Sequence, residues 1–354
     1  MKNRIFVNSP ILLSEFCRRK STRRLIAGVA AVCMLFVGSL PALAGTPYLN
    51  GNAELTRLNN VNSVLNDGNA AVFSSGSAVG VLDWSKYNIG ANQSMTYNGP
   101  NTTFFNLVDG ASKSTINGMI NGNGSVWVIN PNGVAFGANA QVFVGGLFAA
   151  AAGAVGNADA LRAGTASVPV FDNFAGDVTV ADGATFNGFA DFGDPVNPNS
   201  QVALMGKTVT VQEGAKFNVG QVDIAAAAGK IAVDKISGGK VNLSIADFAT
   251  ADDDINVTFE PSTESGKSAD FAGDLNVVAD GSIYVKGAVK ADGAITFQAG
   301  DRTTEATVTH KNMSVASGKY LQGKSVSASA SGVVTIGGEG MSEAEIIATE
   351  LGID

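Results

Sequence analysis

The sequence predicts an all-β protein in which short strands stack as a parallel β-solenoid. Short runs of Val, Ile and Phe alternate with turns of Gly, Asn and Asp, and 43 of the 354 residues are Gly. The phrase DVTVADGATF at 177–186 recurs as TVTVQEGAKF at 208–217, and related phrases begin at Leu275 and Ala288. A repeat of roughly 20 to 30 residues is typical of a solenoid whose coils stack on one another.

The main alternative is a pair of β-sandwiches, which also has short strands and Gly-rich turns. A sandwich predicts up-and-down hairpins, whereas a solenoid predicts the repeated phrase. In a solenoid the Val, Ile and Phe side chains of each coil point inward, and Gly and Asn occupy corners where φ becomes positive. With coils about 4.8 Å apart, about nine to twelve coils would form a rod roughly 45 to 60 Å long.

The first 44 residues are expected to be a signal peptide. Basic residues between Arg18 and Arg24 precede an apolar run of 16 residues, Leu25 to Leu40. Ala42 and Ala44 form a small-x-small cleavage site, so we place the cut after Ala44. A membrane anchor is the alternative, but the apolar run is short for a span and ends at the cleavage signal.

The leader also decides the charge and the thiol content of the mature chain. It carries seven basic residues and one acid, so its removal changes the formal net charge from −8 to −14. Both cysteines, Cys17 and Cys33, leave with it, and a chain without cysteine forms no disulfide. The acidity of the mature chain argues against nucleic acid and against anionic membrane surfaces as partners.

The most informative segment is residues 115–152, which is rich in Asn, Gly and Val and carries almost no charge. Its centre, Asn130-Pro131-Asn132-Gly133, has the residue order of a β-turn. Pro suits the second position of such a turn, Asn the first and third, and Gly the fourth. Because the residues on both sides alternate as strands do, we predict a rigid corner between two short strands. The Asn side chains would be free to bond backbone groups there.

Several other blocks accompany this corner in a fixed order. They are Leu82-Asp83-Trp84, Tyr87-Asn88-Ile89-Gly90, Ser114-Thr115-Ile116-Asn117-Gly118, Val126 to Val134 with Phe136-Gly137, and Val144-Gly145-Gly146-Leu147. Together they resemble the secretion domain of two-partner-secretion exoproteins, the filamentous-haemagglutinin family of Gram-negative bacteria. The resemblance is strong over about residues 48–155. One departure is Phe105-Asn106-Leu107-Val108, where many relatives carry Leu-Asn-Arg-Val, and the Asn-Pro-Asn-Leu block of some relatives is absent.

The resemblance implies a right-handed parallel β-helix, a single-stranded solenoid of the pectin lyase-like kind with an N-terminal β cap. Residues 45–155 would form the secretion domain, made of the cap and the first coils, and residues 156–340 would form further coils. Residues 48–80 are the candidate cap, because an uncovered first coil would expose unpaired strand edges. Ser342 begins a capping-box pattern, which predicts a short C-terminal helix within residues 341–354, with a frayed tail as the alternative.

The resemblance also implies a secretion route. The Sec machinery exports the chain to the periplasm, where the POTRA domains of a cognate outer-membrane barrel transporter bind its N-terminal segment in extended form. The chain then folds outside as a haemagglutinin- or adhesin-like exoprotein, for which a host-cell or glycan receptor would be a further partner. The signature residues are Asn130, Pro131, Asn132 and Gly133, supported by Ser114, Ile116 and Gly118. Each is either read directly by the transporter or purely a structural corner residue.

The sequence contains no recognisable catalytic or metal-binding set, so we predict no enzyme, no cofactor and no metal. His310 is the only histidine, and Asp252 to Asp254 lack the spacing of an EF-hand loop. The alternative function is a secreted β-helical polysaccharide lyase or hydrolase, which would need carboxylates clustered in a groove. Asp191, Asp194 and Asp223 are the candidates for it. A third reading, an adhesin rod exported by another route, predicts no neighbouring gene for a barrel with periplasmic modules.

Overall fold

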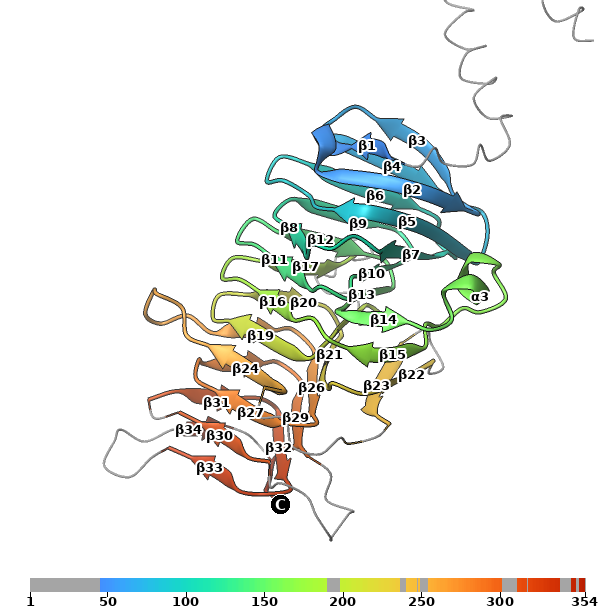
Figure 1. Ribbon diagram of the computed structural model, residues 1–354. Coiled ribbons are helices and arrows are strands. Elements are labelled where there is room, and N and C mark those ends of the chain that lie inside the picture. The colour runs from blue at the N-terminus through green and yellow to red at the C-terminus, as the bar shows by residue number, and fades with distance from the viewer. Residues whose placement is uncertain are drawn as a thin grey trace, which may run out of the picture. The chain divides into compact units, whose positions relative to one another are not determined.

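The chain winds into a parallel β-helix with three long sheets along its sides (Figure 1). The computed structural model describes residues 45–189, 198–235, 240–246, 248, 254–300, 311–316, 318–337, 345–347 and 350–353. These residues belong to one unit, residues 41–354. No helix in these ranges is long and apolar enough to cross a membrane. Ala42 and Ala44, the expected cleavage site, lie outside them.

The strands form three main sheets. Sheet A contains β1 (Thr46–Tyr48), β2 (Ala53–Asn59), β5 (Val79–Tyr87), β7 (Thr103–Val108), β10 (Ser125–Ile129), β13 (Leu147–Ala151), β18 (Gln201–Gly206), β21 (Gln221–Ala226), β26 (Asp274–Ala279), β29 (Ala294–Ala299), β32 (Ser325–Ala330) and β35 (Glu350–Ile353). Sheet B contains β3 (Asn62–Asn66), β4 (Ala70–Ser74), β6 (Ser94–Asn98), β9 (Met119–Gly122), β12 (Gln141–Val144), β17 (Thr185–Gly188), β20 (Lys216–Asn218), β25 (Ala269–Phe271), β28 (Val289–Ala291), β31 (Tyr320–Gln322) and β34 (Glu345–Ile347). Sheet C contains β8 (Ser114–Ile116), β11 (Val134–Phe136), β16 (Val178–Val180), β19 (Thr208–Gln212), β24 (Asn256–Glu260), β27 (Ser282–Val285), β30 (Met313–Val315) and β33 (Val334–Ile336).

Each coil takes one strand from each sheet. From β7 onward the chain visits sheet A, then sheet C, then sheet B, and returns to sheet A one position further along. Every neighbouring pair in sheet A from β5 to β35 is parallel, whereas a β-sandwich would show antiparallel hairpins. The predicted parallel β-helix is therefore confirmed.

The repeated phrase marks the stacking register of two successive coils. Val178 of β16 pairs with Val209 of β19, and Phe186 of β17 pairs with Phe217 of β20. The rings of Phe186 and Phe217 stack with centroids 4.7 Å apart and planes 5° apart, and Phe271 continues the stack at 4.8 Å. Equivalent phrase positions therefore occupy equivalent places in the coils, as a solenoid requires.

The two related phrases do not share this register. The phrase at Leu275 begins in β26 of sheet A, and the phrase at Ala288 leads into β28 of sheet B, whereas the phrase at Asp177 leads into β16 of sheet C. Their likeness reflects a shared strand–turn–strand chemistry at different corners. A short sequence phrase describes a corner but does not say which of the three corners it forms.

Two excursions leave the coils and cover the outer face of sheet A. The first contains β14 (Gly153–Val155), the helix α3 (Ala158–Arg162) and β15 (Phe171–Phe174), and the second is the hairpin of β22 (Ile231–Lys235) and β23 (Val241–Ile245) (Figure 1). Their apolar side chains join an outer hydrophobic cluster with the outward-facing residues of sheet A. Strands β13 and β18 are consequently buried along their whole length.

A β cap, predicted within residues 48–80, closes the N-terminal end, and its strands are antiparallel. Strand β1 pairs antiparallel with β2, β2 with β5, and β3 with β4, whereas β4 and β5 already run parallel to the coils that follow. A single-turn 3-10 helix, η1 (Leu49–Gly51), joins β1 to β2. The antiparallel cap, β1 to β3, thus covers residues 46–66, and the remainder of the expected segment, with β4 and the start of β5, belongs to the first coil.

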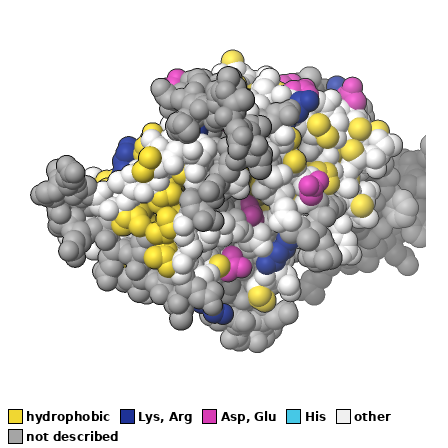
Figure 2. Space-filling model, turned by 90° about the horizontal axis from the view of Figure 1, so that it is seen from below, with side chains coloured by type: hydrophobic (Ala, Val, Ile, Leu, Met, Phe, Trp, Pro, Cys, Tyr) yellow, Lys and Arg dark blue, Asp and Glu magenta, His cyan; other side chains and the backbone are white. Residues whose placement is uncertain are grey.

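The predicted C-terminal helix is wrong. Glu345–Ile347 and Glu350–Ile353 form β34 and β35, which pair parallel to β31 and β32. The edge of the preceding coil offers unpaired backbone groups, and this long-range pairing outweighs the local helical pattern. Ser342, the proposed helix cap, lies outside the described residues. Leu351 is 54% exposed, and hydrophobic side chains gather on part of this end of the molecule (Figure 2).

Candidate functional site

The Asn130–Gly133 segment is a tight corner between sheets A and C. It joins β10 to β11, and the backbone N–H of Gly133 donates to the carbonyl oxygen of Asn130 over 2.9 Å. This bond closes the four-residue turn that the sequence predicts, with Pro131 at its second position. Gly133 has φ of +113°, a conformation that residues with a Cβ rarely adopt. The predicted turn is therefore confirmed.

The side chain of Asn130 points into the protein and organises the corner. Asn130 is 0% exposed. Its Nδ2 donates to the Ser112 carbonyl oxygen and to Ser114 Oγ, each over 3.0 Å, while its Oδ1 accepts the Asn132 backbone N–H over 2.9 Å. Oδ1 also accepts from Asn132 Nδ2 over 3.4 Å, so both donor and both acceptor positions of this amide are used inside the fold. Asn130 therefore links its own turn to the turn of the preceding coil.

Asn132 and Gly133 connect the corner to the coils on either side. Asn132 is exposed, and its Nδ2 donates to the carbonyl oxygen of Gly110 in the preceding coil over 2.7 Å. On the other side, Val134 N–H donates to the carbonyl oxygen of Asp177 over 2.9 Å. A Cβ added to Gly133 would lie 2.9 Å from that same oxygen. The corner thus lies between two neighbouring coils with little room for larger residues.

The supporting signature residues lie on the strand that precedes this corner in the stack. Ser114 and Ile116 belong to β8, which pairs with β11, and both are buried. Ile116 faces the inner core, whereas Ser114 Oγ accepts the hydrogen bond from Asn130. Gly118 lies at the next corner, where a Cβ would overlap the carbonyl oxygens of Gly90 and Gln93. The structure therefore brings Ser114 to the Asn130 turn and places Ile116 and Gly118 further along the same coil.

A second polar group, which the sequence analysis did not single out, lies inside the helix. Asn106 is 0% exposed; its Oδ1 accepts from Trp84 Nε1 over 3.0 Å and from Tyr97 OH over 2.8 Å, and its Nδ2 donates to the Trp127 carbonyl oxygen over 2.9 Å. Tyr87 OH and Tyr97 OH are 2.9 Å apart. Burial raises the pKa of both tyrosines well above the ordinary value, so their hydroxyls stay neutral.

One signal in the sequence could have identified this network. Asn106 stands at an inward position in an otherwise apolar strand, between Phe104 and Val108. A polar residue at such a position needs buried partners, and they come from three other strands. The departure from the family pattern falls next to it, at Leu107, which is buried in the outer cluster. Trp127 is also buried there, so neither of the chain's two tryptophans is exposed.

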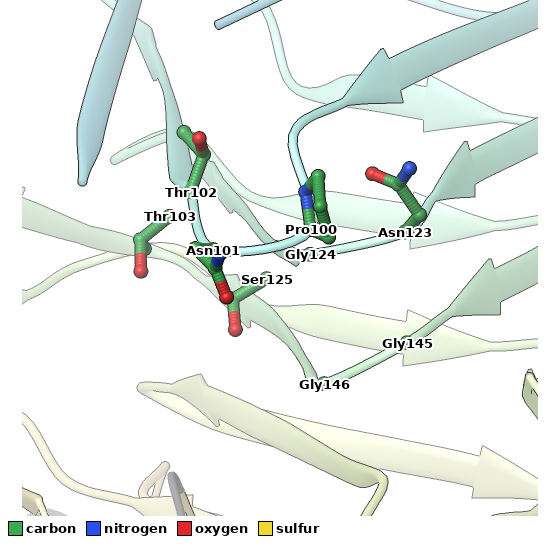
Figure 3. A pocket seen from close by; sticks show the side chains of 9 residues that line it. All are labelled: Pro100, Asn101, Thr102, Thr103, Asn123, Gly124, Ser125, Gly145 and Gly146. Atoms are coloured by element: carbon green, nitrogen blue, oxygen red, sulfur yellow. The ribbon is translucent and has the colours of Figure 1, made fainter. Parts of the chain in front are cut away.

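A shallow hollow of about 200 Å³ opens where three successive coils turn from sheet B to sheet A (Figure 3). It is lined by Pro100, Asn101, Thr102, Thr103, Asn123, Gly124, Ser125, Gly145 and Gly146. Thr102 Oγ1 donates to the Ser77 carbonyl oxygen, and Asn123 Oδ1 accepts from Gly99 N–H. Its lining contains no charged and no aromatic side chain, so the hollow lacks the acid, base or nucleophile that a catalytic site needs.

The carboxylates proposed for a polysaccharide-cleaving groove do not form one among the described residues. Asp223 is buried beneath the second excursion, where Gln201, Gln221 and Asn276 donate hydrogen bonds to it. Burial raises the pKa of Asp223 despite these bonds. Asp191 and Asp194 lie outside the described ranges, as do His310, Asp252 and Asp253. The ranges that the structure describes hold no group of three His, Cys, Asp or Glu residues suited to a metal ion.

Comparison with known families identifies the domain that contains the Asn130–Gly133 corner. The model of the TPS secretion domain family matches residues 52–251, more than half of the chain. This chain belongs to the TPS secretion domain family. The match contains the Asn130 corner, the Asn106 network and both excursions. It extends well beyond residue 155, where the strong resemblance in the sequence ends. The TPS domain is a secretion domain of two-partner exoproteins and not a family of enzymes.

Relatives of this TPS domain include proteins of Haemophilus influenzae. One heme/hemopexin-binding protein from that species is 39% identical over 70 residues, or 19% of this chain and 8% of the relative. A second protein of that description is 36% identical over 76 residues, or 21% of this chain and 8% of the relative. The matched segments thus span under a tenth of the length of these relatives. The crystal structure of the HMW1 secretion domain from the same species aligns with a TM-score of 0.45 and 19% identity, over 85% of this chain and 84% of that one.

Proposed function

We propose that this chain is a secreted two-partner exoprotein whose N-terminal domain is recognised by a cognate outer-membrane barrel transporter. Sec machinery would deliver the chain to the periplasm, where the POTRA domains of the transporter bind it. The chain then crosses the outer membrane and folds as a β-helix at the surface of a Gram-negative bacterium. Membership of the TPS secretion domain family carries this proposal.

The burial of the signature supports recognition of the unfolded chain. Asn130 is 0% exposed and Ser114 is 1% exposed in the folded domain, so a transporter could reach their side chains only before folding. An extended segment of this kind can add as a strand to the edge of a sheet, where backbone hydrogen bonds supply affinity. The same residues then serve two states, first as a recognition sequence and later as a structural corner.

Folding outside would make the transfer one-directional. Each large apolar side chain that moves from water into the core contributes about 1.5 to 3 kcal/mol. The inner core stacks Val, Ile, Leu and Phe through the coils from β5 to β32. A chain that has folded on the outer side would have to lose this burial in order to return.

We further propose an adhesin-like role for the exported protein, with a host-cell or glycan receptor as its partner. The described outer faces of sheets B and C carry mainly polar residues, and the coils present them as flat ladders. A rod with polar, regularly spaced faces is suited to display at a surface. A glycan-array screen of the purified protein, with the parent and an unrelated β-helix compared, tests this role.

The recognition step is tested by Asn130→Ile and Asn132→Ile in a bacterium that carries the transporter. Secreted protein and refolding of the purified mature chain are measured in parallel. Asn130→Ile should impair both, because it removes the hydrogen bonds of a side chain that is 0% exposed. Asn132→Ile changes an exposed side chain, so it should reduce secretion much more than refolding.

The control is Asn139→Ile, which changes another exposed Asn in the turn between β11 and β12. It should be secreted like the parent. Undiminished secretion of Asn132→Ile, together with secretion of Asn130→Ile that falls only as far as its refolding does, would show that the transporter does not read this corner.

A further inference from the structure

An acidic side chain stands on the apolar outer face of sheet A. Asp83 of β5 points outward beside Val81, in a column of residues that continues through Leu107 and Ile129. Asp83 is only 5% exposed. A carboxylate under an apolar cover loses its hydration, so it needs a charged partner or several hydrogen-bond donors.

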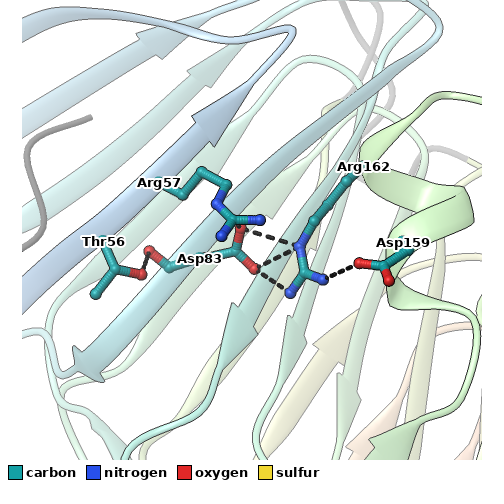
Figure 4. A network of polar contacts seen from close by, with 5 residues as sticks. All are labelled: Thr56, Arg57, Asp83, Asp159 and Arg162. Atoms are coloured by element: carbon teal, nitrogen blue, oxygen red, sulfur yellow. Dashed lines mark hydrogen bonds and ion pairs between the residues drawn. The ribbon is translucent and has the colours of Figure 1, made fainter. Parts of the chain in front are cut away.

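The partner comes from the first excursion, 79 residues later in the chain. Arg162 of α3 reaches Asp83 with two nitrogens: Nη2 lies 2.7 Å from Oδ1, and Nε lies 3.1 Å from Oδ1 and 3.2 Å from Oδ2 (Figure 4). Asp159, one turn earlier on α3, accepts from Arg162 Nη1 over 2.7 Å and orients the guanidinium. This two-nitrogen geometry is the strong form of an Arg–carboxylate pair.

The cap contributes to the same group. Arg57 of β2 has Nε 3.9 Å from Asp83 Oδ2, and Thr56 Oγ1 donates to the Asp83 carbonyl oxygen over 3.0 Å (Figure 4). Asp83 therefore lies where the N-terminal cap, the first coil and the first excursion meet. The Asp83–Arg162 pair raises the pKa of the Arg162 guanidinium, which stays charged.

The excursion also supplies the apolar cover. Leu161, Phe171 and Phe174 are at most 2% exposed and belong to the outer cluster. The rings of Phe171 and Phe174 pack with centroids 4.8 Å apart. Without residues 153–174, the outward side chains of β5, β7, β10 and β13 would lose this covering layer.

We propose that residues 153–174, here called the latch, close over the first coils as a unit and that the Arg162–Asp83 pair controls this closure. The apolar residues of the latch supply the burial. Without Arg162, the latch would close over a carboxylate whose one remaining cation, the exposed Arg57, lies 3.9 Å away, so docking requires Arg162 in place. Because the pair joins residues 79 apart, the outer face of the first coils stays open until the latch segment is available. If the chain emerges from the proposed transporter with its N-terminus first, the latch closes over the cap and first coils only after residue 174 has emerged.

Hydrogen–deuterium exchange of the purified full-length mature chain tests the latch without a transporter. In Arg162→Met, amides of the latch and of β2 and β5 should exchange at least tenfold faster than in the parent, whereas those of β26, β29 and β32 should be unchanged. Asp83→Asn should act on the same segments. The factor by which the double variant accelerates exchange should be smaller than the product of the two single-variant factors, because each single change removes the same ion pair.

Two further variants keep the test decisive. Lys286→Met removes a solvent-exposed ion pair with Glu260 and should leave exchange in the latch unaltered. If Arg162→Met does not fold, Arg162→Lys keeps the charge without the two-nitrogen geometry and should give an intermediate acceleration. Parent-like exchange of the latch and β5 in Arg162→Met or Arg162→Lys would overturn the proposal, as would acceleration spread evenly over all coils. Undiminished secretion of Asn132→Ile, in a protein whose latch exchanges like that of the parent, would instead count against the proposed transporter step and leave the latch proposal standing.

Discussion

At the scale of single residues, Asn130 and Gly133 carry out different tasks in one turn. Asn130 uses its amide to connect two coils, whereas Gly133 permits the backbone angle that reverses the chain between sheets A and C. Both tasks depend on the size of the side chain as well as its polarity, because the next coil lies in close contact with the turn. A Cβ on Gly176 would lie 2.5 Å from the Pro131 carbonyl oxygen. Substitutions at this corner should therefore disturb stacking on both sides.

Gly133→Val should destabilise the folded protein by about 1 to 3 kcal/mol, because a branched side chain is strained at positive φ. The added Cβ would also lie 2.9 Å from the Asp177 carbonyl oxygen. Urea unfolding followed by circular dichroism gives the free energy. Gly76→Val is the matched control, since a Cβ there meets no atom within 4 Å and Gly76 has no positive φ. Equal unfolding midpoints for the parent and Gly133→Val would contradict the strain.

Asn106 shows how a buried polar residue can specify register. In the neighbouring described coils, the residues in register with Asn106 are Leu82, Val128 and Ala150. Asn106 is the only polar residue of this inward-facing column. A slip of one coil would leave Trp84 Nε1 and Tyr97 OH without their acceptor. Because unsatisfied buried groups are costly, this network favours one alignment of the first coils.

At the scale of elements, sheet A differs from the other two sheets because both of its faces are buried over its first half. One outward column reads Val81, Phe105, Trp127, Ala149 and Ala203, and then becomes polar at Asp223, Asn276, Thr296 and Ser327. Asp223 is still buried beneath the second excursion, whereas Thr296 and Ser327 further along the column are exposed. The excursions thus account for the apolar outward residues, which a bare solenoid would not need.

Another corner is held by a single carboxylate that connects several coils. Glu213, between β19 and β20, accepts the backbone N–H of Ser262 over 2.9 Å and that of Ala288, and it receives Lys319 Nζ over 2.8 Å. Burial alone would raise the pKa of Glu213. The hydrogen bonds from Lys319, Ala288 and Ser262 outweigh it and hold this pKa below the ordinary value of 4.5. The carboxylate is therefore charged at neutral pH.

Glu213→Gln should lower the free energy of unfolding at pH 7 by about 1.5 to 3 kcal/mol, the range for hydrogen bonds to a charged group. The folded pKa is depressed, so the carboxylate stabilises the fold above the ordinary Glu pKa and loses this effect as pH falls through the folded value. The difference in unfolding free energy between parent and variant should narrow as the pH falls below 4.5 and through the depressed folded pKa. Urea titrations at several pH values measure it.

The control for this experiment is Glu260→Gln, which affects the exposed pair with Lys286 and should change stability by less than about 1 kcal/mol. A Glu213→Gln variant with the same stability as the parent at pH 7 would show that the carboxylate does not hold the corner. A gap that widens on acidification would contradict the direction of the pKa shift.

At the scale of the whole molecule, the described coils gain stability by stacking on one another. Both cysteines, Cys17 and Cys33, precede the described residues, and the described coils bury one continuous inner core from the cap to β32. Each coil contacts mainly its neighbours, so the protein resembles a one-dimensional array in its energetics. The cap and the latch act at one end of this array, where a coil has a neighbour on only one side.

The purified mature chain, residues 45–354, should refold after dilution from urea without oxidant and with a chelator present. Its far-UV circular dichroism should be dominated by β-structure, because the one described α-helix, α3, has 5 residues. Refolding yield with and without chelator, and with and without reductant, is the measurement. A yield that falls several-fold in chelator or in reductant would reveal a metal or a covalent link that holds the coils together.

The sequence by itself determined the fold class and the Asn130–Gly133 turn, because both depend on local chemistry. Strand alternation, the repeated phrase and the order Asn-Pro-Asn-Gly act over a few residues each. A β cap was also predicted, because an open solenoid end needs a cover, but only the structure shows that its strands are antiparallel. Family membership, too, was visible in blocks of three to nine residues.

Only the tertiary structure decided which face each residue occupies and which distant segments meet. From the sequence alone, Trp127 and Phe105 could face either solvent or the inner core. In the structure they face outward and are covered by residues 153–174, more than twenty residues later in the chain. Asp83 and Arg162 are 79 residues apart, and nothing local connects them. The C-terminal segment forms strands although its sequence has a helical pattern, because a coil edge was available for pairing. These outcomes depend on long-range contacts, whose free energy exceeds local preference and leaves no short pattern in the chain.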